Sequence, residues 1–478
     1  MNFAASPPPD EPPPSDDRPF PDDPLAIEHD PYAALRERDF RLFLSGNFLW
    51  VLGFKMQSVA VGYEVFHRTG SAFALGLVGL VQILPVLALA LFAGHVADRF
   101  DRRMIILVSL VCTAAASLGL ALVSLRGTEV WAIYLLVMIS GVARGFSQPA
   151  RSSFIPQIVS RDRFPNAITW STGAFQLALV LGPALGGVVI AACAGLARRI
   201  GATQISDAGP AAAYLCYAVL ALVFVAMLSR IRSRPVTPSS EGLTAASLVA
   251  GAKFVFSQRV MLAALTLDLF AVLLGGATAL LPIYASKEIL NVGPTGLGWM
   301  EAAPAVGAVV MTIIMAHRAP MERAGAAMLW AVAGFGAATV VFGVSKWFPL
   351  SLLMLFLTGA LDNISVVIRH TLVQLLTPDA MRGRVSAING MFIGASNELG
   401  AFESGVVANL ASSLHGGDTA FGAAFSVAFG GVGTIAVVCL LCILAPALRR
   451  YGRLSGPQGG DSHAYRAEPA PEESTTAL

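Results

Sequence analysis

Nine ionisable residues stand inside long runs of apolar residues, where a charge is unexpected. They are Lys55, Glu64, Arg144, Asp268, Glu301, Asp362, Arg369, Glu398 and Glu403. A charged side chain at the centre of a membrane helix costs about 2.5–3.5 kcal/mol on insertion scales, so it usually faces a cavity or an opposite charge. A carboxylate in such a place can load and release protons, and a nearby Lys or Arg tunes that exchange. These residues are therefore candidates for handling protons or a substrate inside a membrane.

Helical spacing indicates which candidates can act together. Asp362 and Arg369 are seven residues apart, so they lie two turns apart on one face of a helix. Glu398 and Glu403 are five residues apart and diverge by about 140°, so we do not expect them to act as a pair.

We expect Asp268 and Asp362 to be the leading proton carriers. Arg144 and Lys55 would modulate them, and Glu64 is a further candidate for proton coupling. The alternative is a set of ion pairs between helices that only fix the packing.

The composition places most of the chain in lipid. Of the 478 residues, 55% are apolar and only 13% are charged, and the mean hydropathy is +0.68. A soluble protein of this length needs more charged surface, about 25% of its residues. The net charge of +2 gives no reason to expect nucleic-acid binding. The five cysteines lie in apolar runs and indicate neither a disulfide framework nor a metal site, and no cofactor is expected.

Twelve stretches are long and apolar enough to span a bilayer, which needs about 20 residues per helix. They are about 41–67, 72–96, 104–125, 130–150, 166–194, 210–229, 260–285, 294–316, 325–345, 348–372, 384–413 and 420–446. With both termini on one side, the loops of that side hold fifteen Lys or Arg residues and the opposite loops hold six. The positive-inside rule therefore predicts cytoplasmic termini.

The spans divide the chain into two halves between flanking tails. We expect a disordered, Pro-rich acidic tail at 1–35, six-helix halves at 36–230 and 259–453, and a disordered tail at 454–478. Between the halves, residues 231–258 form a cytoplasmic linker. Its apolar stripe of Leu243, Leu248 and Phe254 fits a short helix on the membrane surface, and a plain linker is the alternative.

A weak internal repeat supports this division. After a shift of 219 residues, "GLVQILP" at 79–85 matches "GWMEAAP" at 298–304, with Gln82 opposite Glu301. Repeated six-helix halves are typical of transporters whose substrate site lies between the halves near the middle of the membrane.

The stretch "AGHVADRFDRR" at 93–103 interrupts the apolar sequence between the second and third spans. Its pattern of Gly94, Asp98, Arg99, Asp101, Arg102 and Arg103 resembles the signature of the major facilitator superfamily, with Asp101 in place of the second glycine. The resemblance covers about residues 39–448 and implies an all-α membrane protein with two six-helix halves. It also implies an inner gate, in which these charges form bonds across the halves when the cytoplasmic side closes. A simple positive-inside anchor is the alternative.

The stretch "GPALGG" resembles the antiporter motif of exporters in this superfamily. It holds Gly182, Pro183, Gly186 and Gly187, and small residues at turn spacing let a neighbouring helix approach closely. Ordinary helix packing is the alternative.

Finer likeness points to the branch that includes the enterobactin exporter and related drug and metabolite efflux proteins. The stretches "GSAFALGLVGLVQILP" and "LTPDAMRGRVSAINGMFIGASNELG" carry it. In the first span the chain has Gly53, Phe54 and Lys55 where many of these proteins have Gly-Asp-Trp. A carboxylate often assigned to proton coupling is therefore missing, which leaves the choice between protons and sodium open.

The second half would supply its own gate and polar core. We expect these roles for Glu301, Arg369, Arg382, Arg384, Asn397, Glu398 and Glu403.

The resemblance implies a secondary active transporter that exports small amphipathic molecules, such as drugs, siderophores or metabolites, by alternating access. We expect a monomer in a bacterial-type inner membrane, with a small-molecule substrate, protons or sodium, and lipid as its partners. An uptake carrier, a lipid flippase or a receptor that does not transport are the alternatives. An enzyme is not expected, because the sequence has no P-loop, HExxH or nucleophile elbow.

Overall fold

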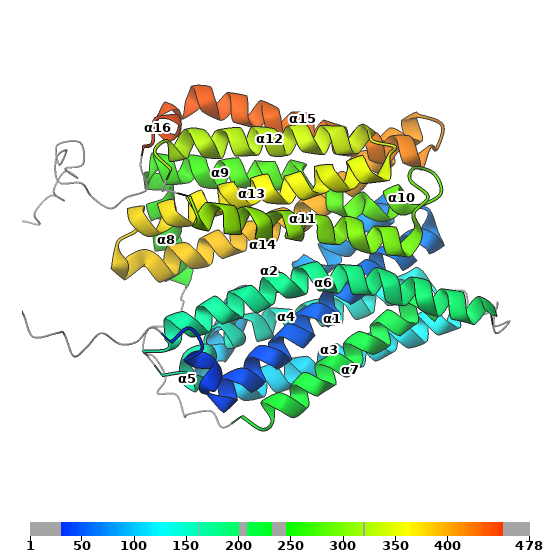
Figure 1. The fold of residues 1–478 in the computed structure, drawn as a ribbon, viewed down its shortest axis with the longest axis horizontal. Helices are drawn as coiled ribbons and strands as arrows, with labels where there is room; N and C mark the ends of the chain where they lie inside the picture. Colours follow the sequence, from blue (N-terminus) through cyan, green and yellow to red (C-terminus); the bar gives the residue numbers. More distant parts are fainter. Residues whose placement is uncertain (1–29, 161, 200–207, 232–244, 319–320, 453–478) are drawn as a thin grey trace, which may run out of the picture.

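The computed structural model describes residues 30–160, 162–199, 208–231, 245–318 and 321–452 (Figure 1). Within these ranges the chain is helical and has no strand. The long helices of the first half are α1 (Arg38–Thr69), α2 (Ala72–Arg99), α3 (Arg102–Arg126), α4 (Val130–Ser152), α6 (Phe164–Arg199) and α7 (Ala208–Leu228). Those of the second half are α9 (Arg259–Leu274) with its continuation η2 (Ala277–Leu280) and α10 (Leu281–Ala285), α11 (Gly293–Ala316), α12 (Ala324–Val344), α13 (Phe348–Leu376), α14 (Asp379–Leu414) and α15 (Thr419–Leu444). The short elements are η1 (Ala34–Arg36), α5 (Ile155–Ile158), α8 (Ala245–Ser257) and α16 (Pro446–Arg449).

The predicted twelve spans of an all-α membrane protein are confirmed. In the described chain, ten of them are long and apolar enough to cross a membrane by length and composition. The other two, α1 and α14, carry four of the nine ionisable candidates, namely Lys55, Glu64, Glu398 and Glu403. The two spans that fall short of this criterion thus hold four of the nine candidates.

Short polar residues and glycines set the ends of the helices. Gly70 ends α1 and Gly127 ends α3, both in the left-handed conformation that favours glycine. Ser71 then begins α2, and its hydroxyl accepts a hydrogen bond from the backbone N–H of Ala74. The tight turn at Gly70 and Ser71 reverses the chain, so α1 and α2 run antiparallel.

The seventh span differs from the prediction of one continuous helix, because it breaks after Leu274. A Cβ on Gly276 would lie 2.3 Å from the carbonyl oxygen of Gly400 on α14, and one on Gly430 of α15 would lie 1.9 Å from that of Leu274. Glycines therefore let two helices approach the broken backbone closely. Such irregular backbone is tolerated at membrane depth where it is buried in protein.

The two halves form separate bundles that meet at one end of the molecule (Figure 1). The seams between them are α2 against α14 and α6 against α11. A Cβ on Gly76 would lie 3.0 Å from the Cα of Gly405, and one on Gly187 would lie 3.0 Å from the Cα of Gly298. Backbone thus meets backbone at both seams, at what we call the far end, opposite the chain termini.

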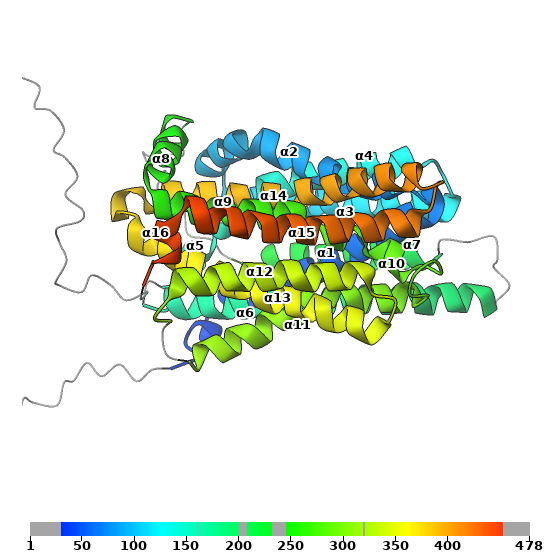
Figure 2. The same cartoon turned by 90° about the horizontal axis from the view of Figure 1, so that it is seen from above.

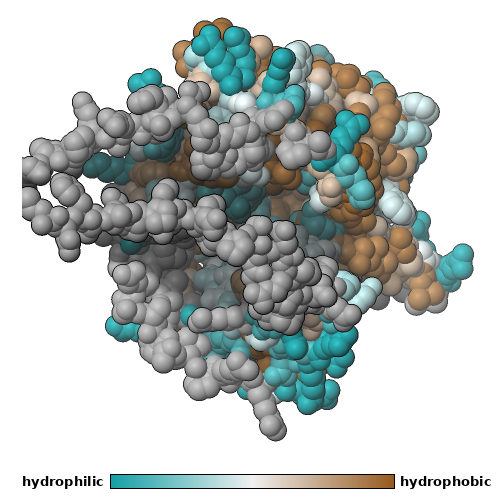
Figure 3. Space-filling model, turned by 60° about the vertical axis from the view of Figure 1, so that its left-hand side comes forward, coloured by the Kyte–Doolittle hydropathy of each residue, from teal (hydrophilic) through white to brown (hydrophobic). Residues whose placement is uncertain are grey.

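At the other end, which we call the terminal end, the halves diverge (Figure 1). Among the described residues, a Cβ on Gly173 of α6, or on Gly390 or Gly394 of α14, would meet nothing within 4 Å. Polar side chains gather on this end, whereas the flank of the molecule is largely apolar (Figure 3). The halves are therefore packed together at the far end and diverge at the terminal end.

The first and last described residues both lie at the terminal end and bind the start of a long helix. Trp170 of α6 donates its indole N–H to the carbonyl oxygen of Pro31 at 3.0 Å, and the backbone N–H of Gly325 on α12 donates to that of Tyr451 at 3.3 Å. The predicted disordered tails fall outside the described residues except for residues 30–35.

Within the predicted linker, residues Ala245–Ser257 form α8, which projects from the side of the bundle at the terminal end (Figure 2). It packs on α14 and α9. Leu243 lies outside the described residues, and the location of α8 on a membrane surface stays a prediction.

Candidate functional site

Arg144 and Glu398 face each other between the two halves of the molecule. Nη2 of Arg144 on α4 lies 3.9 Å from Oε1 of Glu398 on α14. The Arg144 guanidinium also lies 4.9 Å from the centre of the Phe54 ring on α1, a cation–π arrangement. Both charged side chains are largely buried, with 18% and 27% of their surface exposed, so water screens the pair only partly. The pair links α4 of the first half to α14 of the second.

Lys55 adds a second positive charge on the same side. Its Nζ lies 5.9 Å from the Phe54 ring, and it interacts electrostatically with Glu301 of α11 and with Glu398. The first half therefore presents cations, and the second half presents carboxylates. Attraction across this interface favours the closed far end.

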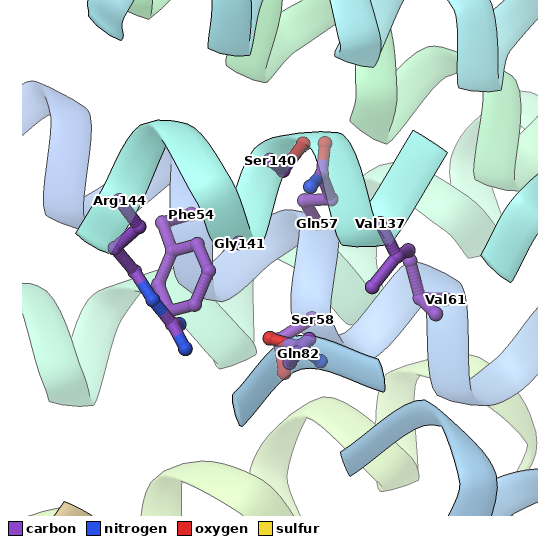
Figure 4. A pocket seen from close by; sticks show the side chains of 9 residues that line it. All are labelled: Phe54, Gln57, Ser58, Val61, Gln82, Val137, Ser140, Gly141 and Arg144. Carbon is purple, nitrogen blue, oxygen red and sulfur yellow. The ribbon is translucent and has the colours of Figure 1, made fainter. Parts of the chain in front are cut away.

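A small pocket opens beside Arg144 in the first half (Figure 4). Its wall consists of Phe54, Gln57, Ser58 and Val61 of α1, Gln82 of α2, and Val137, Ser140, Gly141 and Arg144 of α4. Its wall holds one cation, two amides and two hydroxyls among apolar groups, so it offers several hydrogen-bonding groups next to Arg144. In the described part of the chain, no group of three or more His, Cys, Asp or Glu residues could hold a metal.

Asp268 forms a buried ion pair with Arg369 inside the second half. The pair joins α9 to α13 within the second half, and the side chains are 8% and 1% exposed. Asp362 and Arg369 lie two turns apart on one face of α13, and Arg369 forms its ion pair with Asp268 of another helix. Asp362 is half-buried and has no ion-pair partner among the described residues. Helix rotation decides these pairings, and a linear sequence does not reveal it.

Glu64 is also held inside one half. Tyr214 of α7 donates its hydroxyl to Oε2 of Glu64 at 2.7 Å, and Nη2 of Arg68 lies 2.6 Å from Oε1. Glu64 is fully buried. These contacts connect α1 to α7 near the far end, so Glu64 has both of its partners inside the first half.

The charges of the 94–103 motif bind backbone within the first half. Asp101 begins α3 by accepting a hydrogen bond from the backbone N–H of Arg103 at 2.9 Å. Arg102 donates to the carbonyl oxygen of Ser153 at 3.0 Å, and Arg103 donates to that of Leu228 at 3.2 Å. Ser153 directly follows α4, and Leu228 is the last residue of α7. Both carbonyl oxygens therefore lie at helix C-termini, where the helix dipole favours a cation.

The rest of this motif is described less fully. Arg99 is exposed. The surroundings of Gly94 and the side chain of Asp98 lie outside what the structure describes. The expected bonds across the halves concern the state closed at the terminal end, so the gate role of this motif stays a prediction.

The "GPALGG" motif lies where α6 meets two other helices. A Cβ on Gly182 would lie 2.9 Å from the carbonyl oxygen of Leu52, and one on Gly186 would lie 2.9 Å from the Cα of Met56, both on α1. Gly187 faces the second half instead, because its Cβ would lie 2.4 Å from the carbonyl oxygen of Pro294 on α11.

Pro183 takes part in the same junction. A Cβ on Gly298 of α11 would lie 2.5 Å from the carbonyl oxygen of Pro183. Close helix packing was the alternative to an antiporter role, and the motif provides that packing at the seam between the halves.

The remaining candidates of the second half are dispersed along α14. Glu403 lies beside Ser404, whose hydroxyl is 3.5 Å from its Oε2. Asn397 is exposed and donates to the carbonyl oxygen of Ile393 at 2.8 Å. Arg384 is partly exposed, and the side chain of Arg382 lies outside the described residues. Their gate and core roles stay predictions.

Sequence reasoning missed a cluster around Arg151, which the positive-inside count treated as a loop residue. Its guanidinium lies 3.7 Å from the centre of the Trp50 ring, and its Nη1 donates to Oδ1 of Asn47 at 3.1 Å. The available signal was the spacing of seven residues from Arg144, which places both arginines on one face of α4.

Comparison with known proteins agrees with this architecture. Residues 43–401 match the family model of the Major Facilitator Superfamily. The chain is 26% identical over 414 residues to the enterobactin exporter EntS of Citrobacter koseri, covering 86% of this chain and 93% of that protein. It is 26% identical over 365 residues to the multidrug efflux pump Tap of Mycolicibacterium fortuitum, covering 75% and 86%.

Solved structures show the same fold at low sequence identity. A bacterial homologue of the human lysosomal transporter Spinster, inward-facing and unoccupied, has a TM-score of 0.65 at 14% identity, covering 86% of this chain and 96% of that one. A D-xylose–proton symporter has a TM-score of 0.63 at 14% identity, covering 88% and 100%. The two six-helix halves, their two seams and the match over most of the chain together show that this integral membrane protein belongs to the Major Facilitator Superfamily.

Proposed function

We propose that this protein is a proton-coupled exporter of small amphipathic molecules that works by alternating access. The Arg144–Glu398 pair is the observation that carries the proposal, because it places a protonatable carboxylate against a cation of the other half. Similarity to an enterobactin exporter and a multidrug efflux pump supports export rather than uptake. We further propose that it acts as a monomer in the inner membrane with both termini in the cytoplasm.

The cycle begins in the conformation described above, open at the terminal end. A substrate enters between the halves, and its hydrogen-bond donors compete with Arg144 for the ionised Glu398. The halves then rock, so that the terminal end closes and the far end opens. A proton from outside neutralises Glu398, which releases the substrate, and the protonated carrier returns. After the proton leaves to the cytoplasm, Glu398 binds Arg144 again.

Proton and substrate exclude each other in this scheme, because both need the same carboxylate. That exclusion is what an antiporter requires. Glu301 beside Lys55, and Asp362, are the other carboxylates we propose for proton transfer. Asp268 holds α9 against α13 through Arg369, so we assign it to packing instead of the leading coupling role.

The test is transport by the purified full chain in proteoliposomes. Vesicles are loaded with dyes, siderophores or lipophilic antibiotics, and a pH gradient is imposed. We expect flux of at least one compound to follow the gradient and to stop when an ionophore collapses it.

Other outcomes would identify another function. Flux that follows a sodium gradient instead of the pH gradient would show that sodium is the coupling ion. Flux only toward the side of the vesicle membrane that the terminal end faces would indicate an uptake carrier. Movement of labelled lipid between the leaflets would indicate a flippase. Binding without any flux would indicate a receptor.

A further inference from the structure

Arg151 points into the protein although it stands in the last turn of α4. A long cationic side chain near a helix end normally extends to the water at the membrane surface. Instead, the Arg151 guanidinium lies over the Trp50 ring, and its Nε is buried. Side chains of helices lean toward the helix N-terminus, and on α4 that direction leads away from the terminal end. A buried cation in this position needs a physical reason.

Few groups around Arg151 compensate its charge. Asn47 accepts one hydrogen bond from Nη1, and Trp50 offers its ring face. The other charge that interacts with it is Arg144, a second cation, and Tyr217 of α7 is a neutral neighbour. No acidic side chain of the described residues forms an ion pair with Arg151. The wall made by α1, α4 and α7 therefore carries a net positive charge.

Three buried polar atoms in this wall have no hydrogen-bond partner among the described residues. They are Nε of Arg151, Nε1 of Trp50 and the hydroxyl of Tyr217. Trp50 is 5% exposed and Tyr217 is fully buried. Arginine and tryptophan side chains can only donate, so both atoms need an acceptor. Buried donors are nearly always paired in proteins, so an acceptor from outside the chain is expected here.

From this geometry we propose that Arg151, Trp50, Tyr217 and Asn47 bind an oxyanion of the exported substrate. We call these four residues the Arg151 cluster. A carboxylate, phenolate or sulfonate supplies the missing acceptors and neutralises the cation. A flat apolar ring beside that anion would stack on the aromatic side chains of α1. The ring centres of Trp50 and Phe54 are 6.0 Å apart there.

The spacing of the arginines also sets a length for the substrate. Arg151 and Arg144 are seven residues apart, which is about 10 Å along the helix. The anion at Arg151 and the donor that reaches Glu398 are therefore separated by about the same distance. This inference rests on the proposed function, since it names the chemical class of molecule that the exporter carries.

The test compares three probes of one shape on the full chain in nanodiscs. They are 1-naphthoate, its neutral amide 1-naphthamide, and the cation 1-naphthylmethylammonium, each measured by equilibrium dialysis. We expect naphthoate to bind about tenfold tighter than the amide, and the cation to bind most weakly. The Arg151→Gln variant should reduce the preference for the anion to about twofold or less.

Two milder variants keep the test valid if Arg151→Gln fails to fold. Trp50→Phe keeps the aromatic face and removes a donor, and Tyr217→Phe removes only the hydroxyl. Each should weaken naphthoate binding by about threefold to tenfold and amide binding by less, because a hydrogen bond to a charged acceptor is stronger than one to a neutral carbonyl oxygen. The matched controls are Trp330→Phe on α12, where the side chain is 78% exposed, and Arg126→Gln at the exposed end of α3.

The outcomes separate this inference from the proposed function. Equal affinity of the wild type for naphthoate and naphthamide, or the same anion preference in a folded Arg151→Gln variant, overturns the oxyanion site. Gradient-driven export of neutral or cationic compounds alone, with no anion preference, overturns the site and leaves the exporter standing. Anion binding that depends on Arg151 in a protein without flux supports the site and overturns the exporter.

Discussion

Arg144 of α4 and Glu398 of α14 lie 3.9 Å apart on opposite halves of the molecule. Their helices belong to different bundles, so any rocking of one bundle against the other changes the distance between the two charges. Electrostatic energy between partly buried groups is sensitive to such changes. The pair therefore connects the charge state of one carboxylate to the relative position of the halves.

Glu398→Gln should uncouple transport from the pH gradient. The amide cannot exchange protons at neutral pH and, like the protonated acid, holds the substrate more weakly, so we expect gradient-driven efflux in proteoliposomes to fall by about tenfold or more and to lose its dependence on the pH gradient. Glu129→Gln, at an exposed position before α4, is the control and should behave as the wild type. Wild-type uphill efflux by Glu398→Gln would assign coupling to another carboxylate.

Asp268→Asn and Arg369→Gln should each destabilise the protein. Removal of one partner leaves a buried, uncompensated charge, which typically costs about 3–5 kcal/mol. The double variant should recover part of that loss, because it leaves no single charge behind. Thermal unfolding in detergent measures the three variants against the wild type. Additive losses in the double variant would contradict the ion pair.

Transport by Asp268→Asn answers a separate question. Uphill efflux at the wild-type rate would remove Asp268 from proton coupling. A folded variant that exchanges substrate but has lost uphill efflux would restore it as a proton carrier.

Gly187→Ala should disturb the seam between α6 and α11. The added methyl group would lie 2.4 Å from the carbonyl oxygen of Pro294, so the far end cannot close as it does here. We expect the initial rate of efflux to fall by about tenfold and a cysteine placed at Gly173 to become less accessible from the terminal end. Gly195→Ala on the same helix meets nothing within 4 Å and is the matched control. Equal rates in both variants would show that the seam tolerates the methyl group.

Asp101→Ala should affect stability through the start of α3. Loss of an N-cap side chain costs about 0.5–2 kcal/mol, whereas asparagine caps nearly as well. We therefore expect a lower melting temperature for Asp101→Ala and little change for Asp101→Asn. If Asp101→Asn is as stable as the wild type but transports poorly, the charge of Asp101 belongs to the gate.

The twelve spans and the division into halves could be predicted because hydropathy is a local property. An apolar run of about 20 residues must be a helix in lipid, since its backbone groups have no other partners there. Motif spacing likewise indicated which stretches lie near the ends or seams. The break in the seventh span was not predicted, because it depends on how closely glycines of α14 and α15 approach Leu274.

The pairing of charges could not be predicted in the same way. Asp362 and Arg369 lie on one face of α13, yet Arg369 forms its ion pair with Asp268 of α9, which no spacing within one helix could indicate. Arg151 was counted as a loop charge, but its side chain turns back into the wall between α1 and α4. In both cases the contact depends on a side-chain direction and a helix crossing.

The sequence by itself therefore determined the medium, the number of helices and the residues that carry charge into the membrane, because each of these follows from local composition. Only the tertiary structure decided which of those charges are locked within one half and which face the other. Asp268 and Glu64 are locked, whereas Glu398 meets Arg144 across the interface. The physical reason is that a long-range ion pair depends on the rotation and crossing of two helices, and neither is written in the sequence of one.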